Sequence, residues 1–143
     1  GPFLIGSGSE EEALRDQANR LEISDRVLFT GNLPDVRDHL DAIDLFLLPS
    51  RYESQGLAAM EAMSASVPVI ASRVGGVPGI IEDGVTGKLF EPGNKKELAQ
   101  SISNLLGDDS ERDRLAKNSA LHAQKSFSID RMVLEYEQLY DRV

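Results

Sequence analysis

The sequence predicts an α/β fold with a doubly wound parallel sheet. Short apolar runs of the kind that form buried strands alternate along the chain with longer segments of helical periodicity. Such alternation indicates parallel strands joined by right-handed crossovers, because a helix carries the chain back between two parallel strands. Ligands of this fold class bind beyond the carboxyl ends of the strands, so we expect a site among the loops that follow the strands.

Composition and charge exclude several function classes. The chain has 143 residues, 41% of them hydrophobic, which suits a single domain over residues 1–143. Its formal net charge of -9 argues against a nucleic-acid-binding surface and against an anionic membrane as a direct partner. The chain has no cysteine for disulfides or thiolate chemistry, and no apolar run long enough for a membrane segment. We therefore expect a cytoplasmic protein.

The first strand and helix lie at the start of the chain. Residues 3–5 are expected to end a buried strand, and a chain that begins inside a strand suggests a fragment truncated at its N-terminus. Gly6-Ser-Gly8 then turns into a helix over residues 9–21. We interpret this turn as structural, because the third glycine of a dinucleotide-binding fingerprint would fall at Glu11 and is absent.

Two further strands continue the alternation, which makes the order Rossmann-like. Because strand ends of a parallel sheet share an edge, the loops at Gly6, Gly31 and Ser50 should face one crevice. The loop at Gly31 is either a plain turn or a contact to a ligand. The expected elements are a strand over 26–30, a turn at Gly31-Asn-Leu-Pro34, a short helix capped by Asp35 and ending near Leu40, and a strand over 44–48 stopped by Pro49.

A helix over residues 56–65 follows, rich in the strong helix formers Ala, Met and Leu. Its first N–H groups have no internal partner and lie at the positive end of the helix dipole, so the amides near Gly56 and Leu57 suit an anion, and Gly56 leaves room for its approach. Glu61 lies about 7.5 Å farther along the axis, within reach of a ribose if a diphosphate binds at the helix end. Glu53 precedes the helix. Two carboxylates around an anion site suit a nucleoside, a diphosphate and a sugar.

The second half contains another glycine-rich loop. Gly75 and Gly76 either let the chain pass close to a ligand or form a tight turn before a helix that begins at Pro78. We expect the apolar residues of the last helix to pack in the core. The other expected elements are a strand over 67–70, a turn over 82–87, a strand over 88–90, a helix over 95–106 capped by Asn94, and two helices within 110–143 separated near Phe127–Asp130; the last carries Met132, Leu134, Tyr136, Leu139 and Tyr140.

An ordered set of motifs runs through nearly all of residues 3–106. It comprises Glu53 and Glu61 with seven residues between them, Gly56, Glu61-Ala-Met63, Val67-Pro-Val-Ile70, Gly75-Gly-Val-Pro78 and Asp83-Gly-Val-Thr-Gly87. With these motifs the chain resembles the C-terminal domain of a retaining GT-B glycosyltransferase of family 4. The resemblance implies the nucleotide-sugar-binding half of a GT-B fold, with terminal helices that pack back toward an N-terminal domain outside this chain.

The resemblance also implies roles for the site residues. The position of Glu53 contacts hydroxyls of the donor sugar, which makes Glu53 the catalytic candidate, and the position of Glu61 binds the ribose. The amides around Gly56 and Leu57 hold the phosphate. The remaining donor-binding candidates are Gln55 near the sugar, Gly31 and Val36 at the ends of the loop that borders the base, and Gly75 and Gly76 near the sugar and phosphate.

Three residues depart from the usual family pattern. An aromatic residue commonly stands where Gln55 is, a glycine where Ser66 is, and a glutamate where Gly79 is. Gln55 bears on the identity of the donor sugar, Ser66 on a helix end, and Gly79 removes a carboxylate from a loop.

Two arginines and two histidines complete the candidates. Arg51 and Arg73 could face the diphosphate, although arginine more often forms surface ion pairs. His39 and His122 lack the spacing of metal ligands, so we expect no metal and no cofactor.

The implied reaction transfers a sugar from a nucleotide-diphosphate sugar to an acceptor hydroxyl, with retention at the anomeric carbon. Helix-end amides and basic side chains would stabilise the leaving diphosphate. The acceptor site and two basic residues of the family lie outside this chain, so the fragment alone is expected to bind nucleotide weakly and to catalyse little. Two alternatives stay open: a nucleotide-sugar epimerase of the same architecture, and a non-catalytic nucleotide-binding module.

Overall fold

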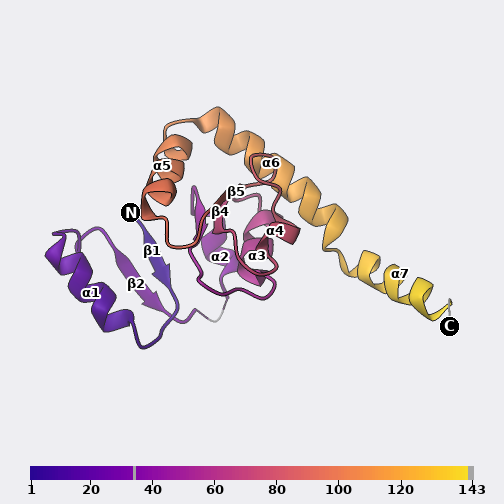
Figure 1. Ribbon diagram of the computed structural model, residues 1–143, viewed down its shortest axis with the longest axis horizontal. Coiled ribbons are helices and arrows are strands. Elements are labelled where there is room, and N and C mark those ends of the chain that lie inside the picture. The colour runs from indigo at the N-terminus through magenta and orange to yellow at the C-terminus, as the bar shows by residue number, and fades with distance from the viewer. Residues whose placement is uncertain (34, 142–143) are drawn as a thin grey trace. The chain divides into compact units, whose positions relative to one another are not determined.

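A computed structural model describes residues 1–33 and 35–141 of the chain (Figure 1). The chain divides into two compact units, Gly1–Val36 and Arg37–Val143. In both units parallel strands alternate with helices, which confirms the predicted parallel α/β class. Gly6 and Gly31 lie in the first unit and Ser50 in the second, so their common crevice stays a prediction. No helix in the described residues is long and apolar enough to cross a membrane.

The first unit contains a pair of parallel strands and one helix. Its elements are β1 (Phe3–Ile5), α1 (Glu11–Arg20) and β2 (Leu28–Gly31), with Phe3 of β1 opposite Leu28 of β2. β1 is not buried as expected, because Phe3 and Ile5 are 47% and 40% exposed; two strands and one helix cover too little of each other. β2 begins two residues later than expected, because the N–H of Arg26 closes a turn by donating to the carbonyl of Ile23 at 2.9 Å.

The second unit is built on a three-stranded parallel sheet. Its strands β3 (Phe46–Leu48), β4 (Val69–Ser72) and β5 (Lys88–Phe90) lie in the order β3-β4-β5. The central strand β4 is buried throughout, whereas the edge strand β3 is only half buried. β4 begins two residues later than expected, because the N–H of Val67 donates to the carbonyl of Ala62 at 2.9 Å and so closes the preceding helix.

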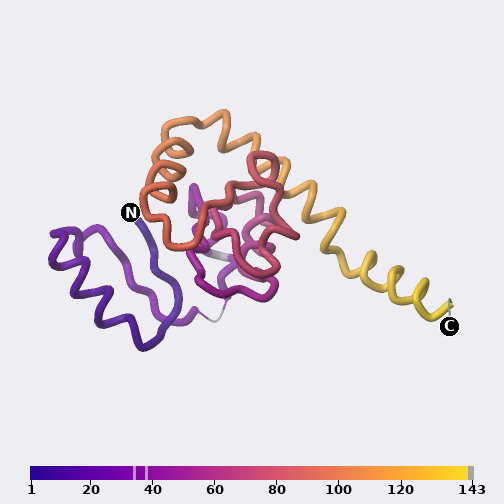
Figure 2. Tube along the Cα trace, in the orientation of Figure 1, coloured from indigo at the N-terminus to yellow at the C-terminus, as the bar shows by residue number. Residues whose placement is uncertain are grey.

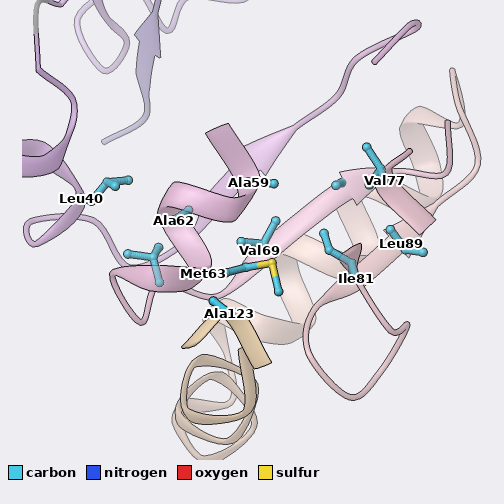
Figure 3. Packing of buried hydrophobic residues seen from close by; sticks show 11 residues of the cluster. Leu40, Ala59, Ala62, Met63, Val69, Val77, Ile81, Leu89 and Ala123 are labelled. Carbon is cyan, nitrogen blue, oxygen red and sulfur yellow. The ribbon is translucent and has the colours of Figure 1, made fainter. Parts of the chain in front are cut away.

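Helices cover both faces of this sheet. On one face, Val69 and Ala71 of β4 pack with Met63 of α3 (Leu57–Ser64) and with Ala123 of α6 (Asp109–Ser126), as Figure 3 shows for the labelled side chains. On the other face, the intervening Ile70 packs with residues of α5 (Lys95–Leu106) and α6. This alternation follows from the two-residue period of a strand and places α3 at the centre of the larger core.

The polar signals predicted several helix ends correctly. Asn94 caps α5 by accepting from the N–H of Glu97 at 3.1 Å, and the bounds of β5 and α5 agree with the expected ones. Asp108, which was not predicted as a cap, caps α6 in the same way, with 2.9 Å to the N–H of Glu111. The two short helices are α2 (Arg37–Leu40) and α4 (Val77–Ile80), and α4 has its proline in the first turn, as expected.

The last helix, α7 (Ile129–Tyr140), follows the predicted break after α6 (Figure 2). The hydroxyl of Ser128 caps it by accepting from the N–H of Arg131 at 3.2 Å. The expected core packing is wrong, because α7 has no buried residue. Its exposed apolar residues are Ile129, Met132, Val133, Leu134, Tyr136, Leu139 and Tyr140.

Candidate functional site

The loop between β3 and α3 holds the first predicted site residue. It ends at Gly56, the N-cap of α3, whose φ of 75° and ψ of 41° lie in the left-handed region that glycine adopts without a steric penalty. One oxygen of the Glu53 carboxylate accepts a hydrogen bond from the N–H of Gly56 at 3.1 Å. The charge of Glu53 is therefore held at the start of α3, where the helix dipole favours an anion.

Helix α3 exposes the side that carries the second carboxylate. Ala59, Ala62 and Met63 are buried, whereas Leu57 and Glu61, one turn apart, are exposed. In the part of the chain that the structure describes, the carboxylate of Glu61 has no hydrogen-bond or ion-pair partner. The N–H groups of Leu57 and of the residue after it likewise have no acceptor among the described residues. Unsatisfied donors and an unpaired carboxylate thus share one exposed surface, which suits an anion and a pair of hydroxyls.

The paired glycines contact the Glu53 loop. A Cβ at Gly75 would lie 1.7 Å from the carbonyl oxygen of Glu53, and a Cβ at Gly76 would lie 2.3 Å from that of Ser54. The N–H of Gly76 donates to the carbonyl oxygen of Ser54 at 3.1 Å. The glycines were expected either to let the chain pass close to a ligand or to form a tight turn. On the side where a Cβ would stand, the atoms that lie close to them are protein backbone. The pair holds the backbone of the Glu53 loop in place.

Gly56 also differs from its expected role. We expected it to leave room for a ligand, but the place of its missing Cβ is filled by α4, with Ile80 Cδ1 at 3.1 Å and Val77 Cγ2 at 3.4 Å. That part of the expectation is wrong. Gly56 allows close packing against α4 and a left-handed backbone conformation, and its N–H donates to the carboxylate of Glu53.

The remaining donor-binding candidates are spread over both units. Gln55 is exposed beside Gly56. Gly31 ends β2 with a φ of 65°, and Val36 is half buried at the end of the first unit. Pro34, between them, lies outside the described residues. Because Gly31 and Val36 belong to the first unit, a role for them beside the Glu53 loop stays a prediction.

The arginines differ in their partners. The guanidinium of Arg73 pairs with Asp83 at 2.8 Å and with Glu91 at 3.1 Å, so its charge is already compensated. Arg51 is exposed, and no ion pair of its side chain is found among the described residues. A surface ion pair was the alternative expected for Arg73, but its two partners were not predicted from the sequence. The strand register contained the signal, since Ser72 lies opposite Phe90 and the next residues are Arg73 and Glu91.

Of two departures from the family pattern, Ser66 lies at a helix end as expected, whereas Gly79 lies in a short helix and not in a loop. Ser66, just past α3, has a φ of 60°, and its N–H donates to the carbonyl of Met63 at 3.1 Å, so it does form a helix end. Gly79 lies in α4, and a Cβ there would meet nothing within 4 Å, so the space for a larger side chain is open.

No group of three or more His, Cys, Asp or Glu residues within residues 1–33 and 35–141 is arranged to hold a metal ion. His122 stacks edge-on against Phe127 with 5.3 Å between ring centroids, which is a packing contact. His39 is exposed. The absence of a metal from the reaction stays a prediction.

Comparison with known proteins identifies the family. The family described as Glycosyl transferases group 1 matches residues 3–122. The chain belongs to this family. The match includes both glutamates and the paired glycines, so the family assignment rests on the same segments as the site. It confirms the resemblance to a GT-B glycosyltransferase, whereas family 4 and retention stay predictions.

Relatives of this glycosyltransferase chain are longer than the chain itself. It is 36% identical over 138 residues to N-acetyl-alpha-D-glucosaminyl L-malate synthase of Bacillus anthracis, a match that covers 96% of this chain and 36% of the relative. Among solved structures, HepE of Anabaena in complex with UDP is 28% identical with a TM-score of 0.92, covering 99% of this chain and 40% of HepE. The C-terminal domain of LpcC from Francisella tularensis is 27% identical with a TM-score of 0.77, covering 83% of this chain and 63% of that domain.

Proposed function

We propose that this chain is the donor-binding domain of a glycosyltransferase, with a nucleotide-diphosphate sugar as its ligand. The observation that carries the proposal is the start of α3, where unsatisfied amides lie between the carboxylates of Glu53 and Glu61. The likeness to HepE, solved with UDP and also with UDP-glucose, supports a nucleotide as the ligand. The likeness to the C-terminal domain of LpcC supports a C-terminal position in a longer protein.

In the proposed mechanism, backbone amides at the N-terminus of α3 bind the diphosphate. The diphosphate accepts hydrogen bonds from the amides at Leu57 and the following residue, which lie at the positive end of α3. The carboxylate of Glu61, one turn along, accepts hydrogen bonds from the ribose hydroxyls. Glu53 contacts the hydroxyls of the sugar. As the glycosidic bond breaks, negative charge grows on the diphosphate, and donors already aimed at it lower the barrier.

The transfer itself requires more than this chain. We propose that the acceptor hydroxyl is bound by an N-terminal domain of the same enzyme, that the sugar is transferred with retention, and that no metal takes part. Alone, the 143-residue chain binds nucleotide weakly and catalyses little. We place the whole enzyme in the cytoplasm, in keeping with a chain free of cysteine.

A titration with UDP, GDP and ADP followed by amide NMR tests the proposal. We expect shifts at Glu53–Glu61 that saturate with one of the three nucleotides. Glu61→Ala should weaken binding by about tenfold or more, because each hydrogen bond to a charged group contributes roughly 1.5 to 3 kcal/mol.

The matched control is Glu137→Ala, an exposed glutamate on α7. It removes the same charge far along the chain and should leave the affinity unchanged. Equal weakening by both substitutions would mean that only net charge matters. If no nucleotide shifted any amide at millimolar concentration, the donor-binding role of this chain would be wrong.

A further inference from the structure

Arg73 lies at the start of the loop that leads to the paired glycines. It follows β4 directly, and its N–H extends the strand pairing by donating to the carbonyl oxygen of Phe90 at 2.9 Å. Its side chain pairs with one carboxylate that precedes the neighbouring strand β5 in sequence and with one that follows it. Nη2 donates to Asp83 Oδ2 at 2.8 Å before the strand, and Nε donates to Glu91 Oε1 at 3.1 Å after it.

Both partners of Arg73 are attached to the fold by further bonds, Asp83 through its carboxylate and Glu91 through its backbone N–H. The second oxygen of Asp83 accepts from the N–H of Leu89 at 3.0 Å. The N–H of Glu91 donates to the carboxylate of Glu97 at 2.9 Å, and Glu97 in turn takes part in the cap of α5. The guanidinium is therefore held by the anchored carboxylate of Asp83 and by the side chain of Glu91, whose backbone is anchored, and we infer that this pairing restrains the direction in which the chain leaves β4.

We call Arg73 with its partners Asp83 and Glu91 the clamp. Three residues connect the clamp to the candidate site. The chain passes from Arg73 through Val74 to Gly75 and Gly76, and both glycines press on the backbone of the Glu53 loop. With carbonyl oxygens 1.7 Å and 2.3 Å from where a Cβ would stand, this contact tolerates little displacement. A shift of residues 73–76, which follow β4, would therefore move the carbonyls of Glu53 and Ser54. It would also disturb the hydrogen bond from the N–H of Gly56 to the carboxylate of Glu53.

We propose that Arg73 is a positioning residue: clamped by Asp83 and Glu91, it holds the glycine pair against the Glu53 loop and so sets the geometry of the donor site. This inference rests on the proposed function for its effect on nucleotide binding. The side chains of Arg73, Asp83 and Glu91 are 40%, 40% and 63% exposed, and ion pairs so exposed add little to global stability. Their effect is therefore expected at the site rather than in the melting temperature.

The clamp is distinct from a direct contact between Arg73 and the ligand. An arginine flanked by two carboxylates carries no excess positive charge to offer a diphosphate. The two roles give opposite results for Asp83→Asn. If Arg73 only positions the loop, the loss of its partner's charge weakens nucleotide binding as Arg73→Ala does. If Arg73 bound the diphosphate, freeing it from Asp83 would leave binding unchanged or tighter.

The experiment uses the full 143-residue chain in four variants: Arg73→Ala, Arg73→Lys, Asp83→Asn and the control Arg131→Ala, which breaks an exposed ion pair on α7. Without nucleotide, hydrogen exchange of the Gly56 and Gly76 amides should quicken by about three- to tenfold in Arg73→Ala and Asp83→Asn, as expected when weak exposed pairs are lost. Amides of α6 should exchange as before. Arg73→Lys should restore part of the protection, because it keeps one charge and loses the fork that reaches both carboxylates.

With UDP, the dissociation constants of Arg73→Ala and Asp83→Asn should rise by a similar factor of about three to ten, and that of the control should not change. Unchanged exchange at Gly56 and Gly76 in Arg73→Ala would overturn the proposal, and so would tighter binding in Asp83→Asn. Because exchange is measured without ligand, it tests the clamp even if the original chain binds no nucleotide, an outcome that would contradict the proposed function alone.

Discussion

Helices α3 and α7 are both rich in apolar residues, yet only α3 has a buried side. In α3, Ala59, Ala62 and Met63 are fully buried between β4 and α6. In α7 no residue is buried, and the exposed fractions of Ile129 and Tyr140 reach 74% and 75%. The two helices were equally clear as helices in the sequence. They differ in what the rest of the described chain places against them.

The difference in burial between α3 and α7 shows that an apolar pattern indicates which side of a helix is to be covered, but not what covers it. α3 is apolar on most of its circumference, which indicates cover from several directions, and β4, α4 and α6 supply it. In α7 the polar and apolar residues lie on clearly separate sides of the helix, so one covering surface would be enough to bury its apolar side. An apolar side chain stabilises the fold by the area that it removes from water, so the exposed apolar residues of α7 add little to the stability of this chain.

The largest expected effect compares two methionines. Met63→Ala removes a fully buried side chain of α3 and should lower the free energy of unfolding by about 2 to 5 kcal/mol, because a cavity remains in the core. Met132→Ala makes the same chemical change on α7, where the side chain is 52% exposed, and should change it by less than about 0.5 kcal/mol. Urea unfolding of both variants measures the two values.

A large loss of stability in Met132→Ala would contradict the comparison. It would mean that the apolar side of α7 is covered in solution. Repeating the measurement at several protein concentrations would then separate cover by a second copy, which depends on concentration, from cover within one chain.

A second prediction concerns the strained end of α3. Ser66 has a φ of 60°, a conformation that costs a residue with a Cβ roughly 1 kcal/mol and glycine little, so Ser66→Gly should stabilise the chain by about 0.5 to 1 kcal/mol. Ser64→Gly is the matched control. It makes the same substitution at the last helical residue of α3 and should destabilise by up to about 1 kcal/mol. Thermal unfolding should show shifts of opposite sign, and two shifts of equal sign would rule out backbone strain as the cause.

Local signals were enough to predict most helices and strands. Asn94 before a lysine-rich helix, Pro49 after an apolar run and the break at Phe127 each act within a few residues of the end they mark. Burial was harder to predict. Both β1 and α7 have apolar residues that the described chain leaves exposed, because the surface that covers an element lies outside its own pattern.

In the candidate site, too, local features were predicted and contacts between distant segments were not. Residue types and spacing placed Glu53, Glu61 and the end of α3 correctly on one loop and helix. They did not show that Gly75 and Gly76 approach protein backbone, because a glycine pair looks the same beside a loop or a ligand. That distinction depends on the positions of chain segments that are some 20 residues apart in sequence and become neighbours only after folding.

The smallest predicted effect concerns α6, which packs against α3 and leads into α7. Its first turns are tied to the loop before β5: Arg114 donates to the carbonyl of Gly84 at 2.8 Å and pairs with Glu111 at 2.7 Å. Lys88 of β5 lies 3.7 Å from the same carboxylate. The hydrogen bond from Arg114 holds the pKa of Glu111 below its usual value, with further lowering from the charges of Arg114 and Lys88 and a partial offset from desolvation.

A lowered carboxyl pKa in the folded state makes the stabilisation pH-dependent with a defined sign. It is present above the ordinary glutamate pKa of about 4.3 and disappears as the pH falls through the lower folded value. Glu111→Gln should therefore reduce the melting temperature slightly at pH 7, by the effect of an exposed pair worth less than about 1 kcal/mol, and by less as the pH is lowered to about 3. Glu135→Gln, which breaks the 2.7 Å pair with Arg131 on α7, should be nearly neutral at both pH values, because α7 is not part of the buried core. A deficit of Glu111→Gln that was undiminished at low pH would show that packing rather than charge holds α6 in place. The stability of α6 would then come from apolar burial, as that of its partner helix α3 does.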